Sequence, residues 1–199
     1  MGNNDKDWEK EFFNRADFLM NHLCLIVGEN AYRVVDCEVY YHSEEHPDPY
    51  VHKGEEQLNN GTWFFNDAGG LDITFGNGEK GIYAGILIRT IQNLKTEQRI
   101  EGIIKVVKEI FRNLGNIFSE GNEIRLCELN PQFITQGKPY TTTRVNLTER
   151  INDMERFFNK YYRFLILSSA MKGKDKILSS LIQDKQISKE DAIKILGYN

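Results

Sequence analysis

The segment from Cys37 to His52 holds the densest group of side chains that could do chemistry, including three of the four histidines of the chain. Imidazole and carboxylate groups bind zinc, iron or manganese, so Glu38, His42 and His46 form one candidate metal site. A spacing of four residues brings side chains together only on a helix. These residues instead follow a strand pattern and precede a proline loop, so the spacing argues against the metal site.

Glu38 could instead act alone as a general base at the end of a strand, with Tyr40 on the same strand face two residues later. Most glutamates in strands are solvated or paired with arginine, which is the structural alternative. Arg89 lies in the apolar run Ala84–Ile91, where a lone guanidinium is costly to bury. It either pairs with a carboxylate, for which Glu38 is chemically suitable, or reaches water at a sheet edge.

Several common catalytic motifs are missing from the sequence. It has no GxxxxGK[ST] pattern, and the glycine run 76–81 precedes a strand instead of opening a helix. It also has no G-x-S-x-G elbow, and no cysteine lies in an activating loop. We therefore expect no cofactor, and we find little support for an α/β-hydrolase or a thiol enzyme.

The elements that must position Glu38 and Arg89 follow from hydrophobic periodicity and turn residues. We predict helices at 8–22, 97–112 and 148–158, strands at 23–28, 32–41, 62–65, 71–75, 82–91 and 161–167, and a long loop at 42–60. Two short helices follow Lys174, the second with a cap at Ser188. The fold class is α+β, with a mixed or antiparallel sheet, flanking helices and a C-terminal helical hairpin. We expect a main domain at 1–170 and the hairpin appendage at 171–199.

Composition and charge narrow the setting of the protein. The three cysteines among 199 residues are odd in number and unclustered, which excludes a disulfide framework and fits a reducing compartment. No apolar run is long enough for a membrane span and the N-terminus is unlike a secretory signal, so we expect a cytoplasmic protein without membrane contact.

Charge is distributed unevenly along the chain. The formal charge of −4 excludes a polycation that binds nucleic acid by bulk charge, but local basic surfaces remain open. Residues 36–57 carry seven acids and one lysine, whereas residues 138–176 carry nine bases and four acids. If DNA is bound, we expect the later stretch to face the phosphates.

An ordered set of segments resembles the alkyladenine (methylpurine) DNA glycosylase family. After an opening helix and hairpin, that family has a strand R-I-V-E-T-E-A-Y, an acidic G-P-E-D loop ending in H-S, a G-T-aromatic strand, an N-I-S strand, a V-L-L-R-A strand, and late segments P-R-I-G-I and R-F-Y-V. The corresponding segments here, within residues 8–168, are Arg33-Val-Val-Asp-Cys-Glu-Val-Tyr40, His42-Ser-Glu-Glu-His-Pro-Asp48, Gly61-Thr-Trp-Phe-Phe65, Asp72-Ile-Thr74, Ile86-Leu-Ile-Arg-Thr90, Thr143-Arg-Val-Asn-Leu147 and Arg163-Phe-Leu-Ile166.

The resemblance implies a metal-free, monofunctional glycosylase that flips a damaged purine out of double-stranded DNA. In that reading Glu38 activates the attacking water, and Arg89 holds the water and a nearby phosphate. The resemblance also makes Tyr40 a stacking aromatic, His52 a pocket histidine after a three-residue insertion, and Ile166 the residue whose carbonyl helps to hold the water.

The chain departs from the family pattern in ways that bear on function. The tyrosine-rich hairpin that wedges into DNA is replaced by the short segment 66–70, which has no aromatic residue. Asp72 stands where the family has an asparagine that rejects guanine. The overall basic character is also missing, and residues from about 170 onward have no counterpart. A non-catalytic DNA-binding or accessory module on the same fold is therefore the alternative, with a metal-dependent hydrolase third.

Overall fold

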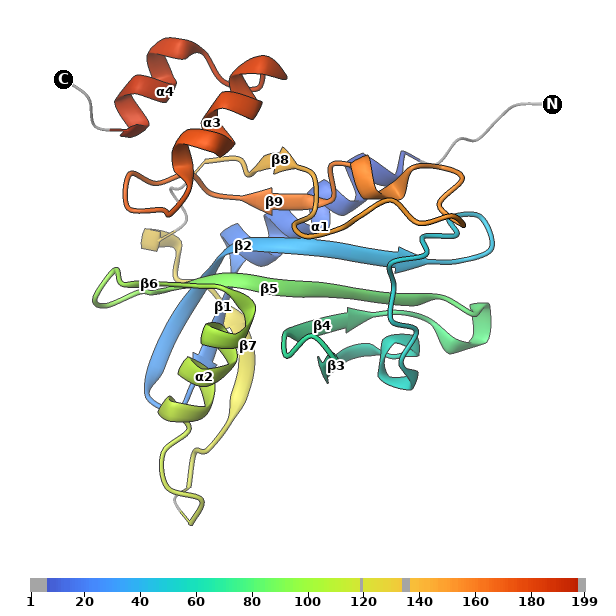
Figure 1. Ribbon diagram of the computed structural model, residues 1–199. Helices are drawn as coiled ribbons and strands as arrows, with labels where there is room; N and C mark the ends of the chain where they lie inside the picture. The colour runs from blue at the N-terminus through green and yellow to red at the C-terminus, as the bar shows by residue number, and fades with distance from the viewer. Residues whose placement is uncertain (1–6, 119, 134–136, 197–199) are drawn as a thin grey trace.

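The computed structural model describes residues 7–118, 120–133 and 137–196. In this part of the chain the architecture is α+β, a curled antiparallel sheet of nine strands with four helices against it (Figure 1). The helices are α1 (Trp8–His22), α2 (Ile103–Asn113), α3 (Lys174–Gln183) and α4 (Lys189–Leu196). The strands are β1 (Leu23–Val27), β2 (Asn30–His42), β3 (Asn60–Phe65), β4 (Leu71–Phe75), β5 (Tyr83–Asn93), β6 (Arg99–Glu101), β7 (Ile124–Glu128), β8 (Tyr140–Thr142) and β9 (Arg163–Leu165).

The two long strands β2 and β5 form the centre of the sheet. The main strand order is β3-β4-β5-β2-β1-β7, while β6 pairs with β5, β9 with β2 and β8 with β9. Register shifts between β2 and β5 leave Val35 and Arg89 as the extra residues of two bulges. Bulges bend a strand and re-aim its side chains, so this centre is where a side chain can leave the regular alternation.

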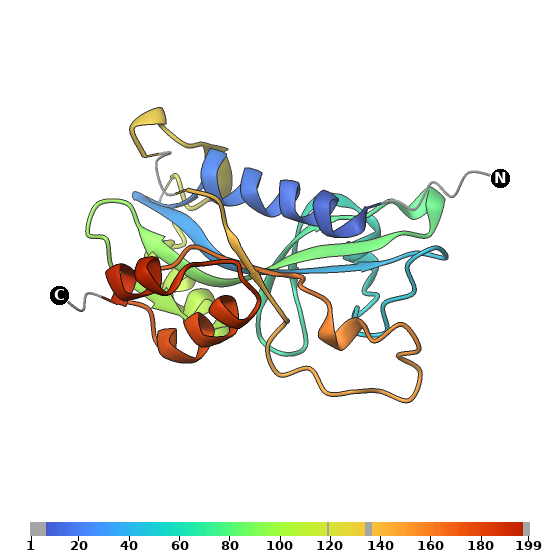
Figure 2. The ribbon, with the colours of Figure 1, turned by 90° about the horizontal axis from the view of Figure 1, so that it is seen from above.

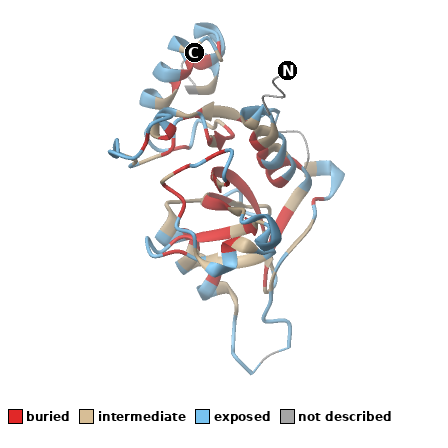
Figure 3. Ribbon diagram, turned by 90° about the vertical axis from the view of Figure 1, so that its right-hand side faces the viewer, coloured by how far each residue is buried: buried red, intermediate tan, exposed pale blue. Residues whose placement is uncertain are grey.

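Alternate residues of β2 face opposite sides of the sheet. Tyr41 packs under α1, with ring centroids 4.8 Å from Trp8 and 5.5 Å from Phe12. Glu38 and Tyr40 therefore point to the other side, because successive strand residues alternate. Seen from above, α1 and α2 lie on opposite sides of the central strands (Figure 2). Buried residues follow these strands and the inner side of α1 (Figure 3).

Two predicted helices differ from the structure. The helix expected at 97–112 begins only at Ile103, because residues 99–101 pair with β5 as strand β6 and Gly102, at φ 105°, separates the two elements. The helix expected at 148–158 is wrong, since this segment contains only the short 3₁₀ turn Phe157–Asn159. Strands β7 and β8 were not predicted, because both lie in a mixed segment without clear alternation.

The two helices predicted after Lys174 are confirmed as α3 and α4. The amide of Asp191 donates to Ser188 Oγ at 3.0 Å, which is the predicted cap. The hairpin binds the free edge of β8 through Gln186, whose side chain accepts from the Thr141 amide at 3.0 Å and donates to the Thr141 carbonyl at 2.8 Å. One glutamine thus continues the ladder of the sheet. Residues 197–199 of the predicted appendage lie outside the described residues.

Candidate active site

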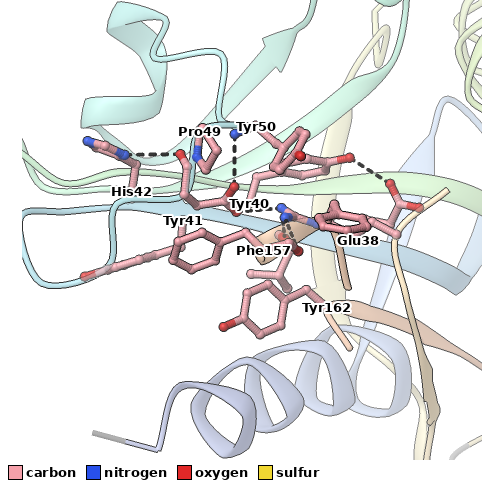
Figure 4. A network of polar contacts seen from close by, with 12 residues as sticks. Glu38, Tyr40, Tyr41, His42, Pro49, Tyr50, Phe157 and Tyr162 are labelled. Atoms are coloured by element: carbon pink, nitrogen blue, oxygen red, sulfur yellow. Dashed lines mark hydrogen bonds and ion pairs between the residues drawn. The ribbon is translucent and has the colours of Figure 1, made fainter. Parts of the chain in front are cut away.

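Glu38 is a fully buried carboxylate in the middle of β2. Its Oε1 accepts from the backbone amide of Val145 at 2.7 Å and lies 3.3 Å from Nη1 of Arg89. Its Oε2 accepts from the hydroxyl of Tyr40 at 2.9 Å, as Figure 4 shows. Glu38, Tyr40 and Arg89 of two neighbouring strands therefore converge, together with the Val145 amide from a third segment.

Arg89 reaches Glu38 because it occupies the bulge of β5. Its backbone carbonyl is used by Gly102, whose amide donates to it at 2.8 Å, so the bulge is anchored by the start of α2. The side chain is 17% exposed and lines a surface cavity of about 250 Å³. Arg89 thus links the buried carboxylate of Glu38 to an open, charged cavity at the surface.

Opposing effects set the protonation of Glu38. Burial raises the pKa of Glu38, while the positive charge of Arg89 and the Val145 amide lower it in part. Burial also raises the pKa of Tyr40, as does the neighbouring Glu38 charge, so the phenol stays a donor. A carboxylate with a raised pKa and a nearby guanidinium has the character expected of a general base.

Arg144 is the largest feature of the site that sequence reasoning missed. It is buried, and its Nη1 donates to Asp48 Oδ2 at 2.7 Å. Its guanidinium carbon lies 4.6 Å from the ring centroid of Tyr40 and 5.5 Å from those of Tyr50 and Tyr162, which Figure 4 shows grouped beside β2. Arg144 therefore fixes the ring of Tyr40 and brings the next residue's amide to Glu38. The segment 143–147 carried the signal, but no role was drawn from it.

Asp72 lies on the same face of the sheet as Glu38, because both pair with Leu87. Its Oδ1 accepts from Asn66 Nδ2 at 3.0 Å. Burial raises the pKa of Asp72 to about 7, and the charge of Glu38 adds to this. Asp72 is therefore a neutral acid below neutral pH, separated from Glu38 by one strand.

The missing side chain of Gly85 leaves room between Asp72 and a buried glutamine. A Cβ on Gly85 would lie 3.2 Å from Asp72 Oδ2 and 3.3 Å from Gln57 Nε2. That Nε2 atom is buried without a hydrogen-bond partner among the described residues. Gln57 was not singled out from the sequence, since nothing in a polar loop indicates which amide is buried.

His52 and Ile166 are not brought to Glu38 by any contact in the described structure. His52 is exposed, and its ring centroid lies 6.3 Å from that of Phe64. The Ile166 amide donates to the Val35 carbonyl, whereas Glu38 pairs with Arg163 of β9. Their roles in substrate binding remain predictions.

The two histidines of the alternative metal site have other partners. His42 Nδ1 contacts the Asp48 carbonyl at 3.2 Å. His46 uses Nδ1 on the Tyr41 carbonyl and Nε2 on the Tyr162 hydroxyl, both at 2.9 Å. The described residues contain no group of three or more histidine, cysteine or acidic side chains placed to hold a metal ion. The described residues thus provide no set of ligands for the alternative metal site.

Comparison with known proteins adds one relative. No family model matches the chain. It is 28% identical over 209 aligned residues to uncharacterized protein L759 of Acanthamoeba polyphaga mimivirus, a match that covers 88% of this chain and 95% of that protein. The aligned region includes the site and covers most of the length of both chains. Among the described residues, no helix has the length and apolar character needed to cross a membrane.

Proposed function

We propose that this protein is a divergent DNA glycosylase of the methylpurine type, which hydrolyses the N-glycosidic bond of an alkylated or deaminated purine in double-stranded DNA. The observation that carries the proposal is the direct contact of Glu38 with both Arg89 and Tyr40. These are the residues that the resemblance assigns to water activation and base stacking. The three free cysteines agree with a cytoplasmic setting.

In this mechanism the damaged nucleotide leaves the duplex and its base stacks near Tyr40. A water oxygen bonds to C1′ of the sugar, and Glu38 takes a proton from that water. The bond from C1′ to the purine nitrogen breaks, and the base leaves with the bonding electron pair. The positive charge of Arg89 favours the ionised form of Glu38 against the effect of burial, and the carboxylate stabilises positive charge developing on the sugar.

The burial of the Glu38 side chain sets one condition on this mechanism. Both carboxylate oxygens are occupied by Tyr40 and Val145, and the side chain is 0% exposed. Because the side chain is fully buried, a water molecule reaches Glu38 only if a neighbouring group such as Tyr40 moves. Entry of a purine against the Tyr40 ring would be such a displacement.

The test is base release from duplexes that carry 3-methyladenine, 7-methylguanine or hypoxanthine. We expect release by the native protein and none by Glu38→Gln, with Glu79→Gln at an exposed position as the matched control. The same loss of release in Glu79→Gln, or full release by Glu38→Gln, would contradict the assignment.

The full burial of the Glu38 carboxylate favours a second candidate, a non-catalytic DNA-binding or accessory module. In that case Glu38 is a structural residue that anchors Tyr40 and Val145 to the sheet. Salt-dependent binding of duplex DNA without release from any lesion would favour this module over the enzyme.

A further inference from the structure

The cavity beside Arg89 is unusually rich in cations for an acidic protein. Its volume is about 250 Å³, and four cations line it: Arg89, Arg99, Arg163 and Lys172. They come from β5, β6, β9 and the loop that follows β9. In Figure 1, β6 lies between that loop and α2. The fold therefore gathers charges that are far apart in the sequence.

The carboxylates in this cavity already have partners. Arg163 binds Asp36 through two hydrogen bonds of 2.9 and 2.7 Å. Both oxygens of Glu101 accept from the Lys172 amide at 3.2 Å, and one lies 3.6 Å from Arg99 Nε. Within the described part of the chain, the ammonium of Lys172 makes no ion pair. The cavity thus keeps positive charge beyond what its own acids neutralise.

Two guanidinium donors in the cavity make no hydrogen bond within the described residues, and that of Arg99 has only the 3.6 Å ion-pair contact with Glu101. The Nε atoms of Arg89 and Arg99 are buried without a hydrogen-bond partner among the described residues, and the Arg99 side chain is only 7% exposed. Buried donors are nearly always satisfied, so each such atom needs an explanation. An oxygen ligand in the cavity would supply the missing acceptor for these forked donors.

The start of α2 adds to the attraction for an anion. Gly102 lines the cavity and precedes the first helical residue, and it offers no side-chain cap to the first turn. The uncapped amides of an 11-residue helix and its dipole favour a negative group there. This is independent of the arginines.

A groove of about 310 Å³ continues from the cavity, with Arg99, Glu101 and Lys172 in both. Its other cations are Lys105, Lys108 and Arg112, all on α2. Arg112 pairs with Glu109 at 3.2 Å, whereas no ion pair among the described residues includes either lysine. The result is a row of exposed positive charge that leads away from the cavity.

We propose that the cavity binds one phosphate group and that the α2 groove binds neighbouring phosphates of a nucleic-acid strand. The choice of nucleic acid rests on the proposed function, whereas the phosphate chemistry of the cavity does not. A row of separate cations fits a repeating anion better than a single small one. The nucleic-acid strand would then run past Arg89, on the outer side of the ion pair between Glu38 and Arg89.

The experiment measures binding of an undamaged 20-base-pair duplex by fluorescence anisotropy between 50 and 200 mM salt, so that base release plays no part. The variant Lys105→Ala/Lys108→Ala/Lys172→Ala is compared with Lys10→Ala/Lys80→Ala/Lys189→Ala, which removes equal charge at exposed positions elsewhere. We expect the groove variant to bind about 10- to 100-fold more weakly and its salt slope to fall by roughly 2–3, since each lost phosphate contact removes about 0.9. The control variant should bind like the native protein.

The outcomes separate this inference from the proposed function. Equal binding by both variants would overturn the groove, whether or not a base is released. If the duplex fails to bind, titration of inorganic phosphate into native protein and Lys172→Ala, followed by NMR, decides the cavity. If added phosphate shifts only the NMR signals of residues 89, 99, 102 and 172, the cavity binds phosphate and the nucleic-acid partner is wrong. If no signal shifts, both parts of the proposal are wrong.

Discussion

Two arginine–carboxylate pairs contact Tyr40, one through the Glu38 carboxylate and one through the Arg144 guanidinium, and they differ in how firmly each arginine is held. Arg144 donates to Asp48 at 2.7 Å, to the Val39 carbonyl at 3.3 Å and to the Phe157 carbonyl at 3.1 Å, and its side chain is 0% exposed. Arg89 makes one contact of 3.3 Å with Glu38 and is partly exposed to a cavity.

The difference indicates that the two ion pairs have different roles. Arg144 ties the Val39 carbonyl of β2 and the loop residue Asp48 to the segment 143–157, which has little regular structure of its own. Its loss leaves a charge inside the protein without a partner. Arg89 can gain new acceptors from the cavity without a change in the fold. We therefore assign structure to the Arg144 pair and chemistry to the Glu38 pair.

The largest expected effect comes from breaking the structural pair. Asp48→Ala leaves Arg144 buried without its counter-ion, so we expect the free energy of unfolding to fall by about 3–5 kcal/mol. Urea denaturation followed by circular dichroism measures this loss. Arg89→Met should cost clearly less, because Glu38 keeps Tyr40 and Val145 as donors. Equal losses in the two variants would remove the distinction.

The next effect concerns pH and Asp72. The folded pKa of about 7 lies above the unfolded value, so the folded state binds the extra proton and its stability falls as pH rises through the interval up to about 7. Asp72→Asn removes this dependence. Between pH 5.5 and 8 we expect the variant to gain about 1–2 kcal/mol relative to the native protein.

Thermal melts of both proteins at these two pH values test the Asp72 prediction. The other titrating groups are common to both, so the difference between them isolates one carboxyl. A constant difference across this range would show that Asp72 is already ionised at pH 5.5.

The smallest stability effect is expected at Glu38 itself. Glu38→Gln removes a buried charge and keeps an oxygen acceptor for Val145, so unfolding should change by less than about 1 kcal/mol at pH 6. Since burial raises the pKa of Glu38, the variant should gain stability relative to the native protein as pH rises. A large loss of stability would instead favour the accessory-module reading.

Part of this arrangement was predictable from the sequence. The periodicity of α1 and the turn residues around the central strands located Glu38, Tyr40 and Arg89 on strands, and the cost of burying Arg89 required a partner. What the sequence could not show was the bulge that aims Arg89, because a bulge depends on the register between two strands.

The segment 143–162 shows a second limit of sequence reasoning. The sequence predicts a helix near 148–158, yet tertiary contacts hold this segment without one. Side chains hold the backbone of Phe157 on both sides, since Arg144 donates to its carbonyl at 3.1 Å and Asp153 accepts from its amide at 2.6 Å. The sequence also did not indicate the cation cavity, since residues 97–112 are predicted as one helix and two of the cations, Arg163 and Lys172, lie more than 60 residues after Arg99.

The most direct test of the central claim is single-turnover base release by Glu38→Gln, measured together with its melting temperature and its affinity for the lesion duplex. Our account predicts that the native protein releases a damaged purine, whereas the variant binds the same duplex, melts at a similar temperature and releases none. Release at the native rate by a correctly folded Glu38→Gln would contradict the account.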